Sequence, residues 1–410
     1  MIGMRVFALF LASILISSPV AIAQSTIMLG EIIDLDEVSL GLEGASISPD
    51  GKLVIAHGAD SSIYLIDPEN PNNHSKVSWI GDSTLLDSSF HPQGDSALIA
   101  GTGGTLLRYI SSNLSIEEVG SGSEFGGEDL RSVSWNSDGS WAFVGGEAGS
   151  LWKVRSIDGE LEIHPIEGSG DSAINAISCI PGSRYCVISS NTDGIGVIDE
   201  NQDLHWLGGV GYPWIDVVCP SGEMIDCVAV STDVTIAVIR IEIDDVSSST
   251  VYPNDIVQLQ GIQGMITGVQ IHSEGRSLIS LAPFGIIEHD LELRKSFDWI
   301  KNSVAAEYNL TLSDERIVSS WSNGAFSGWI LTGEGSLVHF SPVEEEEKSG
   351  ILDIWIGIVI LGGTALLVAS LITSSSPRIS RWVAIKIGSE EERSRAIREQ
   401  RRIDRKNKRA

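Results

Sequence analysis

Basic residues and metal-binding motifs are scarce in this sequence, and each shortage excludes a class of function. The 410 residues include 27 lysine and arginine residues against 55 aspartate and glutamate residues, a net charge of −28. A field of that sign repels nucleic acid, so we expect no nucleic-acid partner. The eight histidines form neither an HxH nor an HExxH motif, and the DxDxDG calcium loop is absent. The sequence therefore predicts no metal and no cofactor.

Motifs for catalysis are also missing. Residues 101–105 are rich in glycine, but they lack the lysine and the following helix that a phosphate-binding loop requires. His57 and His91 are isolated, and we interpret them as structural or surface residues. No spacing marks a pair of carboxylates for glycoside hydrolysis. The sequence predicts no catalytic residue, although an active site assembled from several loops leaves no linear motif.

Helical periodicity is scarce between residues 30 and 342, where short alternating apolar segments are separated by Gly, Pro, Asn and Asp. This pattern predicts strands joined by tight turns. A four-strand unit recurs; its first copy begins at residue 45, with later strands expected at 53–57, 63–67 and 77–80. The turn after the first strand of each copy, for example SPDG, HPQG or NSDG, ends in glycine. These glycines are Gly51, Gly94, Gly139, Gly182, Gly222, Gly275 and Gly324, and they lie 40 to 53 residues apart.

Seven copies of a four-strand unit resemble the WD40-type and related SPDG propellers over residues 30–342. The resemblance implies an all-β ectodomain at 24–342 with seven blades, each of which buries its faces against its neighbours. The WD dipeptide is absent, although residues 151–154 occupy its strand, and residues 137–141 match an Asp-box only in part. The resemblance implies an architecture and no particular activity.

The last copy lacks a fourth strand. Its expected strands are 317–322, 326–331 and 337–340, and the repeat then stops at Pro342. Upstream of the first copy, residues 31–37 form a predicted strand that belongs to no blade. We predict that this segment completes the last blade beside residues 337–340, because pairing of the two ends removes an exposed sheet edge.

Both ends of the chain carry membrane signals. Residues 1–23 combine Arg5, an apolar stretch and the small-residue pattern at 21–23, which predicts a cleaved signal peptide; an uncleaved anchor is the alternative. Residues 354–373 form a run of 20 residues with no ionisable group. They lie in a predicted C-terminal transmembrane helix at 351–373, for which a buried core helix is the alternative.

Charges on either side of the apolar run predict its orientation. The acidic linker at 343–350 contains four consecutive glutamates, whereas the tail at 374–410 contains 12 basic and 5 acidic residues, a net charge of +7. Positive residues stay on the cytoplasmic side of a membrane. We therefore expect a single-pass protein of the cell membrane, with the ectodomain outside and the C-terminus in the cytoplasm. Without Arg5 and the tail, the chain carries 14 basic and 50 acidic residues.

The tail contains features of a membrane-bound segment. Arg378, Arg381 and Lys386 are interspersed with apolar residues, and we expect them to contact the headgroups of anionic lipids. Ser389 and Glu392 match a capping box that opens a helix. A docking site for a cytoplasmic partner is the alternative role of the tail.

The four cysteines form two local pairs, Cys179 with Cys186 and Cys219 with Cys227, and each pair spans a turn glycine. We predict two hairpin disulfides in neighbouring blades, because the signal peptide implies an oxidising compartment. A zinc site and reduced thiols are the alternatives.

Two further sets of residues carry expectations. Asn73, Asn113 and Asn309 begin N-glycosylation patterns and are permitted acceptor sites. Seven tryptophans fall in or beside predicted strands, and we interpret them mainly as blade-packing residues, with a minority available for a binding rim. They are Trp135, Trp141, Trp152, Trp206, Trp214, Trp321 and Trp329.

These features leave two classes of function. The first is a non-enzymatic binding or scaffold module that holds a protein, a peptide or a glycan on a propeller face at the cell surface. The second is a membrane-tethered propeller hydrolase, for example one acting on glycans, that uses loop carboxylates. An acidic cluster that converges in the central channel, with room for a ligand, favours the second class.

Overall fold

A computed structural model describes residues 27–342, apart from 78, 121, 158–159, 221–225, 263, 274 and 324–326, together with residues 363 and 376–409. The chain divides into two compact units, Met1–Val343 and Glu344–Ala410. The predicted signal peptide, acidic linker and membrane segment lie outside the described residues, apart from residue 363, and they stay predictions. Of the helices that the structure describes, none combines the length and the apolar character needed to span a membrane.

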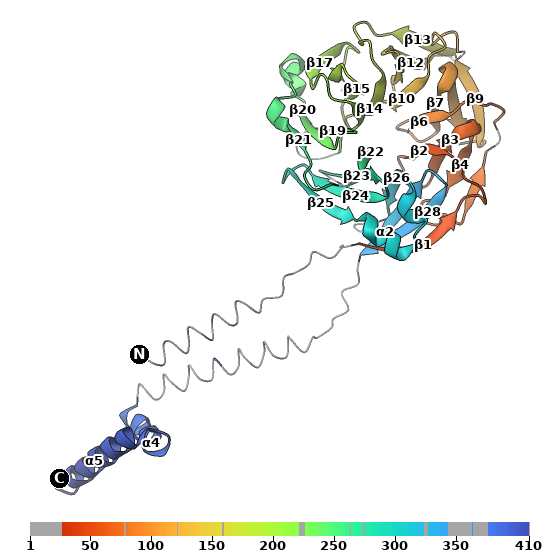
Figure 1. Ribbon diagram of the computed structural model, residues 1–410. Coiled ribbons are helices and arrows are strands. Elements are labelled where there is room, and N and C mark those ends of the chain that lie inside the picture. Colours follow the sequence, from red (N-terminus) through yellow and green to blue (C-terminus); the bar gives the residue numbers. More distant parts are fainter. Residues whose placement is uncertain are drawn as a thin grey trace. The chain divides into compact units, whose positions relative to one another are not determined.

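Strands dominate the first unit, where the described residues form seven four-stranded sheets arranged as blades around a central axis (Figure 1). Blades 1 to 3 contain β2 (Leu42–Ile47), β3 (Val54–Gly58), β4 (Ile63–Ile66), β5 (His74–Lys76); β6 (Leu85–Phe90), β7 (Ser96–Gly101), β8 (Leu106–Ile110), β9 (Ser115–Gly120); and β10 (Leu130–Trp135), β11 (Ala142–Gly146), β12 (Leu151–Ile157), β13 (Glu160–Pro165). Blades 4 to 6 contain β14 (Ile174–Cys179), β15 (Cys186–Ser190), β16 (Gly194–Ile198), β17 (Leu204–Gly208); β18 (Trp214–Val218), β19 (Asp226–Ser231), β20 (Thr235–Arg240), β21 (Ile256–Gln258); and β22 (Met265–Ser273), β23 (Arg276–Ala282), β24 (Gly285–Asp290), β25 (Lys295–Ile300). Blade 7 contains β26 (Ile317–Ser322), β27 (Gly328–Thr332), β28 (Ser336–Pro342) and β1 (Ile27–Asp34). The predicted all-β, seven-bladed propeller is confirmed.

Two local features of the backbone recur from blade to blade. The five turn glycines that the structure describes adopt positive φ angles, for example +69° at Gly51 and +74° at Gly94, a region in which a residue with a Cβ is strained. In addition, the innermost strand of every blade has a register irregularity near its start, such as that between Leu85 and Asp87 in β6. A bulge re-aims the side chains beside it. The repeated bulge therefore shapes the wall of the central channel.

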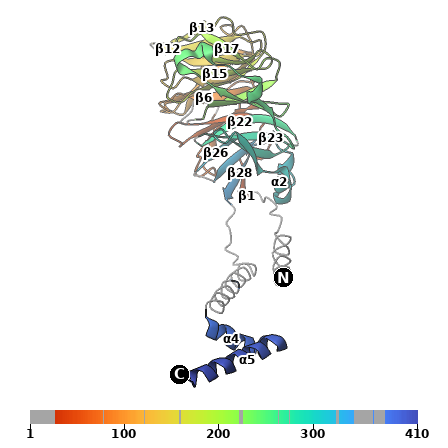
Figure 2. The same cartoon turned by 90° about the vertical axis from the view of Figure 1, so that its left-hand side faces the viewer.

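The predicted closure of the ring is confirmed. β1 pairs with β28, so that Leu29 lies opposite Phe340 and Ile33 lies opposite Leu337. The strand begins at Ile27 rather than at residue 31. The helix α2 (Asn302–Tyr308) lies beside β1 in both views (Figures 1 and 2), and the hydroxyl of Tyr308 donates a hydrogen bond to the carbonyl of Gly30. The N-terminal strand thus ties the two ends of the propeller together.

One strand prediction is wrong. The fourth strand of blade 1 is β5, at His74–Lys76, and not residues 77–80. Its side chains are polar, because an outermost strand contacts little of the core. Val77 and Trp79, which follow it, pack against the core between blades 1 and 2 and supply the apolar signal that suggested a strand there.

The core consists of seven hydrophobic clusters among the described residues, one between each pair of neighbouring blades. All seven tryptophans that the sequence suggests as packing residues belong to these clusters. Trp152, Trp214, Trp321 and Trp329 are buried in them, and Trp135, Trp141 and Trp206 pack against them. Their interpretation as blade-packing residues is confirmed.

Both predicted disulfides are present. Cys179–Cys186 joins β14 to β15 in blade 4, and Cys219–Cys227 joins the end of β18 to β19 in blade 5. The two bridges account for all four cysteines, so the zinc and free-thiol alternatives are excluded.

Helices make up the described part of the second unit, α4 (Pro377–Lys386) and α5 (Glu390–Asn407). The predicted capping box is confirmed: the N–H of Ser389 donates to a carboxylate oxygen of Glu392 at 3.0 Å, and the N–H of Glu392 donates to Oγ of Ser389 at 3.5 Å. In the first unit, short 3-10 helices lie at Ala59–Ser61, Thr102–Gly104, Ile243–Ser248, Pro253–Asp255 and Leu312–Asp314.

Candidate functional site

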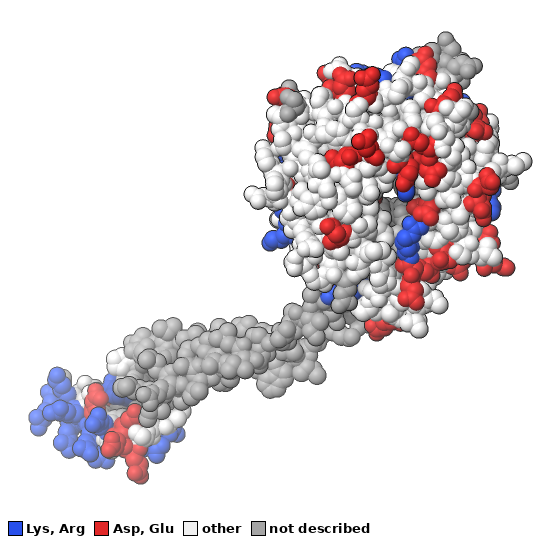
Figure 3. Space-filling model, turned by 45° about the horizontal axis from the view of Figure 1, so that its top comes forward, with Lys and Arg blue, Asp and Glu red and all other residues white. Residues whose placement is uncertain are grey.

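The innermost strands of all seven blades line a central channel with a volume of about 370 Å³. Short side chains such as Ser88, Ser134 and Thr267 form much of the wall. The charged residues on the wall are Glu43, Asp87, Arg131, Asp216 and Arg316. Figure 3 shows one face of the propeller, on which clusters of acidic side chains are prominent.

Asp87 and Asp216 occupy equivalent places in the channel wall, directly after the bulges of β6 and β18. Asp87 accepts a hydrogen bond from the backbone N–H of Val133 in the next blade, at 2.8 Å. Asp216 accepts one from the backbone N–H of Val269, again in the next blade, at 2.7 Å. The second oxygen of each carboxylate accepts the N–H of the following residue at 2.8 Å. Each aspartate therefore links its own blade to the next.

The same two carboxyl groups titrate at unusually high pH. Burial raises the pKa of Asp87 to about 7, the N–H donors oppose that rise, and the negative charge of Asp216 adds to it. Burial also raises the pKa of Asp216 to about 7. The two groups therefore line one channel and titrate near neutral pH.

Other blades place a different polar group at this position. Ser132 donates a hydrogen bond to the carbonyl of Ile174 at 3.1 Å, and Ser319 donates one to the carbonyl of Ala45 at 3.4 Å. In four of the seven blades, the residue after the bulge thus forms a hydrogen bond to the next blade. Both oxygens of each aspartate are used in such backbone contacts, which favours a structural role for the pair.

The arginines of the channel wall are also engaged. Arg316 lies 3.0 Å from a carboxylate oxygen of Glu43 and 2.9 Å from the carbonyl of Leu42, and Arg131 pairs with Glu147. Across the described residues, no group of three or more His, Cys, Asp and Glu side chains is placed to hold a metal ion. Both arginines of the channel wall are therefore already paired with carboxylates of the protein.

The two histidines singled out in the sequence have packing contacts. His57 is fully buried, with Nδ1 3.1 Å from the carbonyl of Leu85, and burial lowers its pKa to about 4. His91 stacks edge-on against Trp135, with 4.8 Å between ring centroids. Both contacts agree with the structural interpretation.

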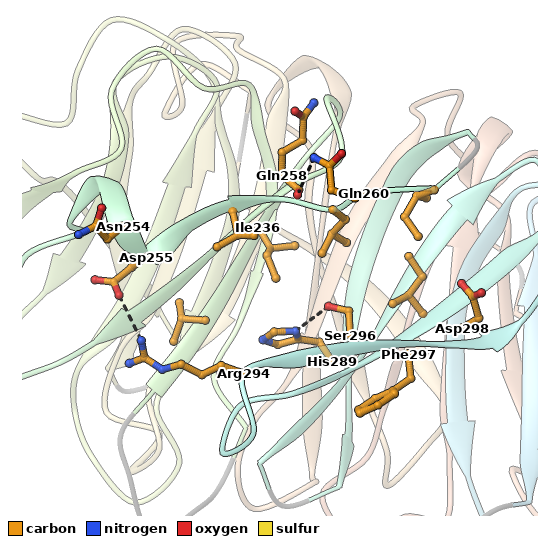
Figure 4. A pocket seen from close by; sticks show the side chains of 15 residues that line it. Ile236, Asn254, Asp255, Gln258, Gln260, His289, Arg294, Ser296, Phe297 and Asp298 are labelled. Carbon is orange, nitrogen blue, oxygen red and sulfur yellow. Dashed lines mark hydrogen bonds and ion pairs between the residues drawn. The ribbon is translucent and has the colours of Figure 1, made fainter. Parts of the chain in front are cut away.

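A larger cavity, of about 500 Å³, lies between the outer strands of blades 5 and 6 (Figure 4). We call it the blade 5–6 groove. On the blade 5 side its lining includes Ile236 of β20 and Val257 of β21, and on the blade 6 side it includes His289 of β24 with Ser296 and Phe297 of β25. This volume falls within the range of about 300–1,000 Å³ that is usual for ligand pockets.

The rim of the groove combines an ion pair with exposed apolar groups. Asp255 and Arg294 approach to 3.4 Å. Val257 and Phe297 are 49% and 46% exposed. A neighbouring cavity of about 370 Å³ shares Ile262 with the groove, so the depression continues along blade 6.

His289 is the buried polar side chain of the groove, with 2% of its surface exposed. Its Nδ1 lies 3.0 Å from Oγ of Ser296, whereas its Nε2 has no hydrogen-bond partner among the described residues. In Figure 4 the ring lies between Ser296 on one side and the Asp255–Arg294 pair on the other. Burial lowers the pKa of His289 to about 4, although the charge of Asp290 opposes that shift, so the imidazole is neutral at pH 7.

The glycosylation patterns lie on the surface of the propeller. Asn73 is in the loop before β5, Asn113 is in the β8–β9 turn, and Asn309 directly follows α2. The side-chain oxygen of Asn113 accepts the hydroxyl of Ser115 at 2.7 Å, and that of Asn309 accepts the hydroxyl of Thr311 at 2.7 Å. Glycan attachment at these sites stays a prediction.

The predicted lipid-contact residues Arg378, Arg381 and Lys386 lie on α4, in the second unit. Arg381 donates a hydrogen bond to the carbonyl of Pro377 at 2.8 Å. Contact with lipid headgroups stays a prediction.

Sequence reasoning missed three residues of these sites, Asp87, Asp216 and His289. Aligning the repeat copies by their first strands places the two aspartates at one position. His289 carries a weaker signal, a polar residue two places after the buried Ile287 in a mostly buried strand. None of the three lies in a recognised motif.

No protein family model matches the chain, and no curated protein sequence matches it.

Proposed function

We propose that the protein is a single-pass, membrane-anchored propeller that binds a protein, a peptide or a glycan at the cell surface. The blade 5–6 groove is the observation that carries the binding role. It has the volume of a ligand site, exposed apolar groups at its rim and a buried nitrogen without a partner among the described residues. Propellers are commonly binding or scaffold modules, because their blades hold surface side chains on a rigid ring.

Sequence and covalent features support the location. The signal-peptide pattern at 1–23, the apolar run at 354–373 and the positive tail agree on one orientation. The two disulfides fit an oxidising compartment outside the cytoplasm.

Site-specific photo-crosslinking in the native host cell tests this function. Benzoylphenylalanine replaces Phe297 at the groove, and in a control chain it replaces the exposed Glu118 on the outer strand of blade 2. We expect a discrete crosslinked partner at position 297 and none at position 118. Equal crosslinking at both positions, or none at position 297, contradicts a binding site in the groove.

One observation favours the hydrolase as a second candidate. Asp87 and Asp216 line the same channel, and each has a pKa near 7, the range that suits a general acid. A panel of chromogenic glycosides, applied to the full chain and to its Asp87→Asn and Asp216→Asn variants, separates the candidates. Turnover that both substitutions abolish establishes the hydrolase, and the absence of turnover leaves binding as the function.

A further inference from the structure

The interface between blades 5 and 6 has a composition unlike that of the other six. Each of the other clusters buries at least one aromatic ring, such as Phe143 between blades 3 and 4 or Trp214 between blades 4 and 5. The blade 5–6 cluster contains only Val, Ile and Leu among the described residues, both in its buried set and in the side chains packed against it. The blade 5–6 groove lies at this interface, and the phenylalanine in its lining, Phe297, is 46% exposed at the rim.

The pairing of strands shows a second difference at the same interface. His289 lies on the third strand of blade 6, at a position that each blade turns toward the preceding blade. In the other blades this position holds Ile66, Tyr109, Val154, Ile198, Ile239 and Phe340. Blade 6 is therefore the one blade that replaces an aliphatic or aromatic side chain by an imidazole.

The replacement leaves polar atoms without partners. Nε2 of His289 is buried and unpartnered among the described residues, and so is Oγ of Ser277, the residue opposite His289 on β23. A buried polar atom without a hydrogen bond destabilises the fold, so such atoms are rare unless a ligand or water satisfies them. His289 belongs to the lining of the groove, although its Nε2 is itself buried, so a group that enters the groove reaches this nitrogen by displacing neighbouring lining side chains.

A phenol matches this combination of features. Its ring can pack against the aliphatic part of the lining, which includes Ile236, Val257 and Ile287, as rings pack at the other six interfaces. Its hydroxyl can donate or accept, and so it pairs with either tautomer of a neutral histidine. A phenylalanine ring leaves Nε2 unpaired, and a carboxylate is disfavoured by a propeller with a large acidic surplus.

We propose that the blade 5–6 groove binds a tyrosine side chain of an extended, basic peptide segment of a partner protein, with the hydroxyl on Nε2 of His289. This inference rests on the proposed binding function and names the ligand of the groove. The acidic surplus favours lysine or arginine beside the tyrosine. The edge strands β21 and β25, which border the groove, offer backbone groups to an extended segment.

Titration of three blocked tripeptides into the full-length chain in detergent, followed by ligand-detected NMR, tests the proposal. The probes are acetyl-Lys-Tyr-Lys-amide, acetyl-Lys-Phe-Lys-amide and acetyl-Glu-Tyr-Glu-amide. We expect the Lys-Tyr-Lys peptide to bind about tenfold more tightly than the Lys-Phe-Lys peptide, since only the phenol satisfies Nε2. We also expect it to bind severalfold more tightly than the Glu-Tyr-Glu peptide at low salt.

Three variants assign the binding to the groove. His289→Leu introduces the kind of side chain that other blades carry, and we expect it to make the Tyr and Phe peptides bind equally. Val257→Trp places a ring at the rim, and we expect it to abolish binding of both peptides. Glu118→Trp, on the outer strand of blade 2, is the matched control and leaves binding unchanged.

Two results overturn the proposal: equal affinity of wild type for the Tyr and Phe peptides, or a Tyr preference that survives His289→Leu. If His289→Leu does not fold, the wild-type preference and the effect of Val257→Trp decide the question. A partner crosslinked at position 297 without a Tyr preference rejects only the tyrosine ligand. A missing partner at position 297 rejects the proposed function itself.

Discussion

Asp87 and Asp216 show that one residue can have a structural and an electrostatic effect at once. Each carboxylate accepts an N–H of the next blade, which holds the ring together, yet burial raises its pKa to about 7. The folded state therefore holds these protons more tightly than the unfolded chain, whose aspartates titrate near 3.8. Their contribution to stability is fully present below that pH and is lost as the pH rises through 7.

We predict that the stability of the propeller falls between pH 4 and pH 7 because of these two groups. The upper limit of the effect is about 1.4 kcal/mol per pH unit for each group, and the open channel reduces it. Asp216→Asn and Asp87→Asn each remove part of the slope in urea-unfolding midpoints measured at several pH values. Surface carboxyls such as Asp50, whose pKa hydrogen bonding to Ser48 lowers, act in the opposite direction. The readout is therefore the difference between each variant and wild type in the pH dependence of the unfolding midpoint. Glu118→Gln is the control. If neither aspartate variant changes this pH dependence, the prediction is wrong.

At the scale of elements, the features that the sequence predicted best are those that recur in every copy of the repeat. A turn glycine recurs in the sequence of every copy, and it has positive φ in each of the five turns that the structure describes. The missing fourth strand of blade 7 pointed to the N-terminal segment. Outer strands such as β5 were harder, because His74–Lys76 has no buried face to impose alternation. The blade 5–6 groove was not predictable, since the lack of a ring at one interface becomes visible only after two blades are paired in register.

The packing of the closing strand β1 leads to a further prediction. Leu29 is buried between blades 6 and 7, whereas its neighbour Met28 faces solvent on the other side of the strand. We expect Leu29→Ala to destabilise the propeller by about 2–5 kcal/mol, as large-to-small core substitutions do. Met28→Ala should stay within about 0.5 kcal/mol of wild type. Urea-unfolding midpoints of the two variants check this, and similar losses in both would show that β1 contributes little packing to the closed ring.

At the scale of the whole molecule, charge is divided between the two ends of the proposed membrane protein. The tail at 374–410 carries a net charge of +7 in a chain whose total is −28. An acidic ectodomain is repelled by anionic headgroups, whereas basic residues beside a membrane gain about 1 kcal/mol each from them. If the proposed topology holds, the tail and not the propeller makes the lipid contact.

We therefore predict that α4 is protected by anionic lipid. Hydrogen exchange of α4 in the full chain, reconstituted in nanodiscs, should be slower with phosphatidylserine than with phosphatidylcholine. Raising the salt from 0.1 M to 1 M should remove the difference, because the screening length falls from about 10 Å to about 3 Å.

Replacing Arg378, Arg381 and Lys386 together by glutamine should also remove the difference between the two lipids. The same change in charge at Arg405 and Lys406, in the last turn of α5, and at Lys408, which follows it, should leave most of the protection, since those residues lie farther along the chain from the proposed membrane segment. Equal exchange in the two lipids would reject headgroup contact by α4 and favour a cytoplasmic protein as the ligand of the tail.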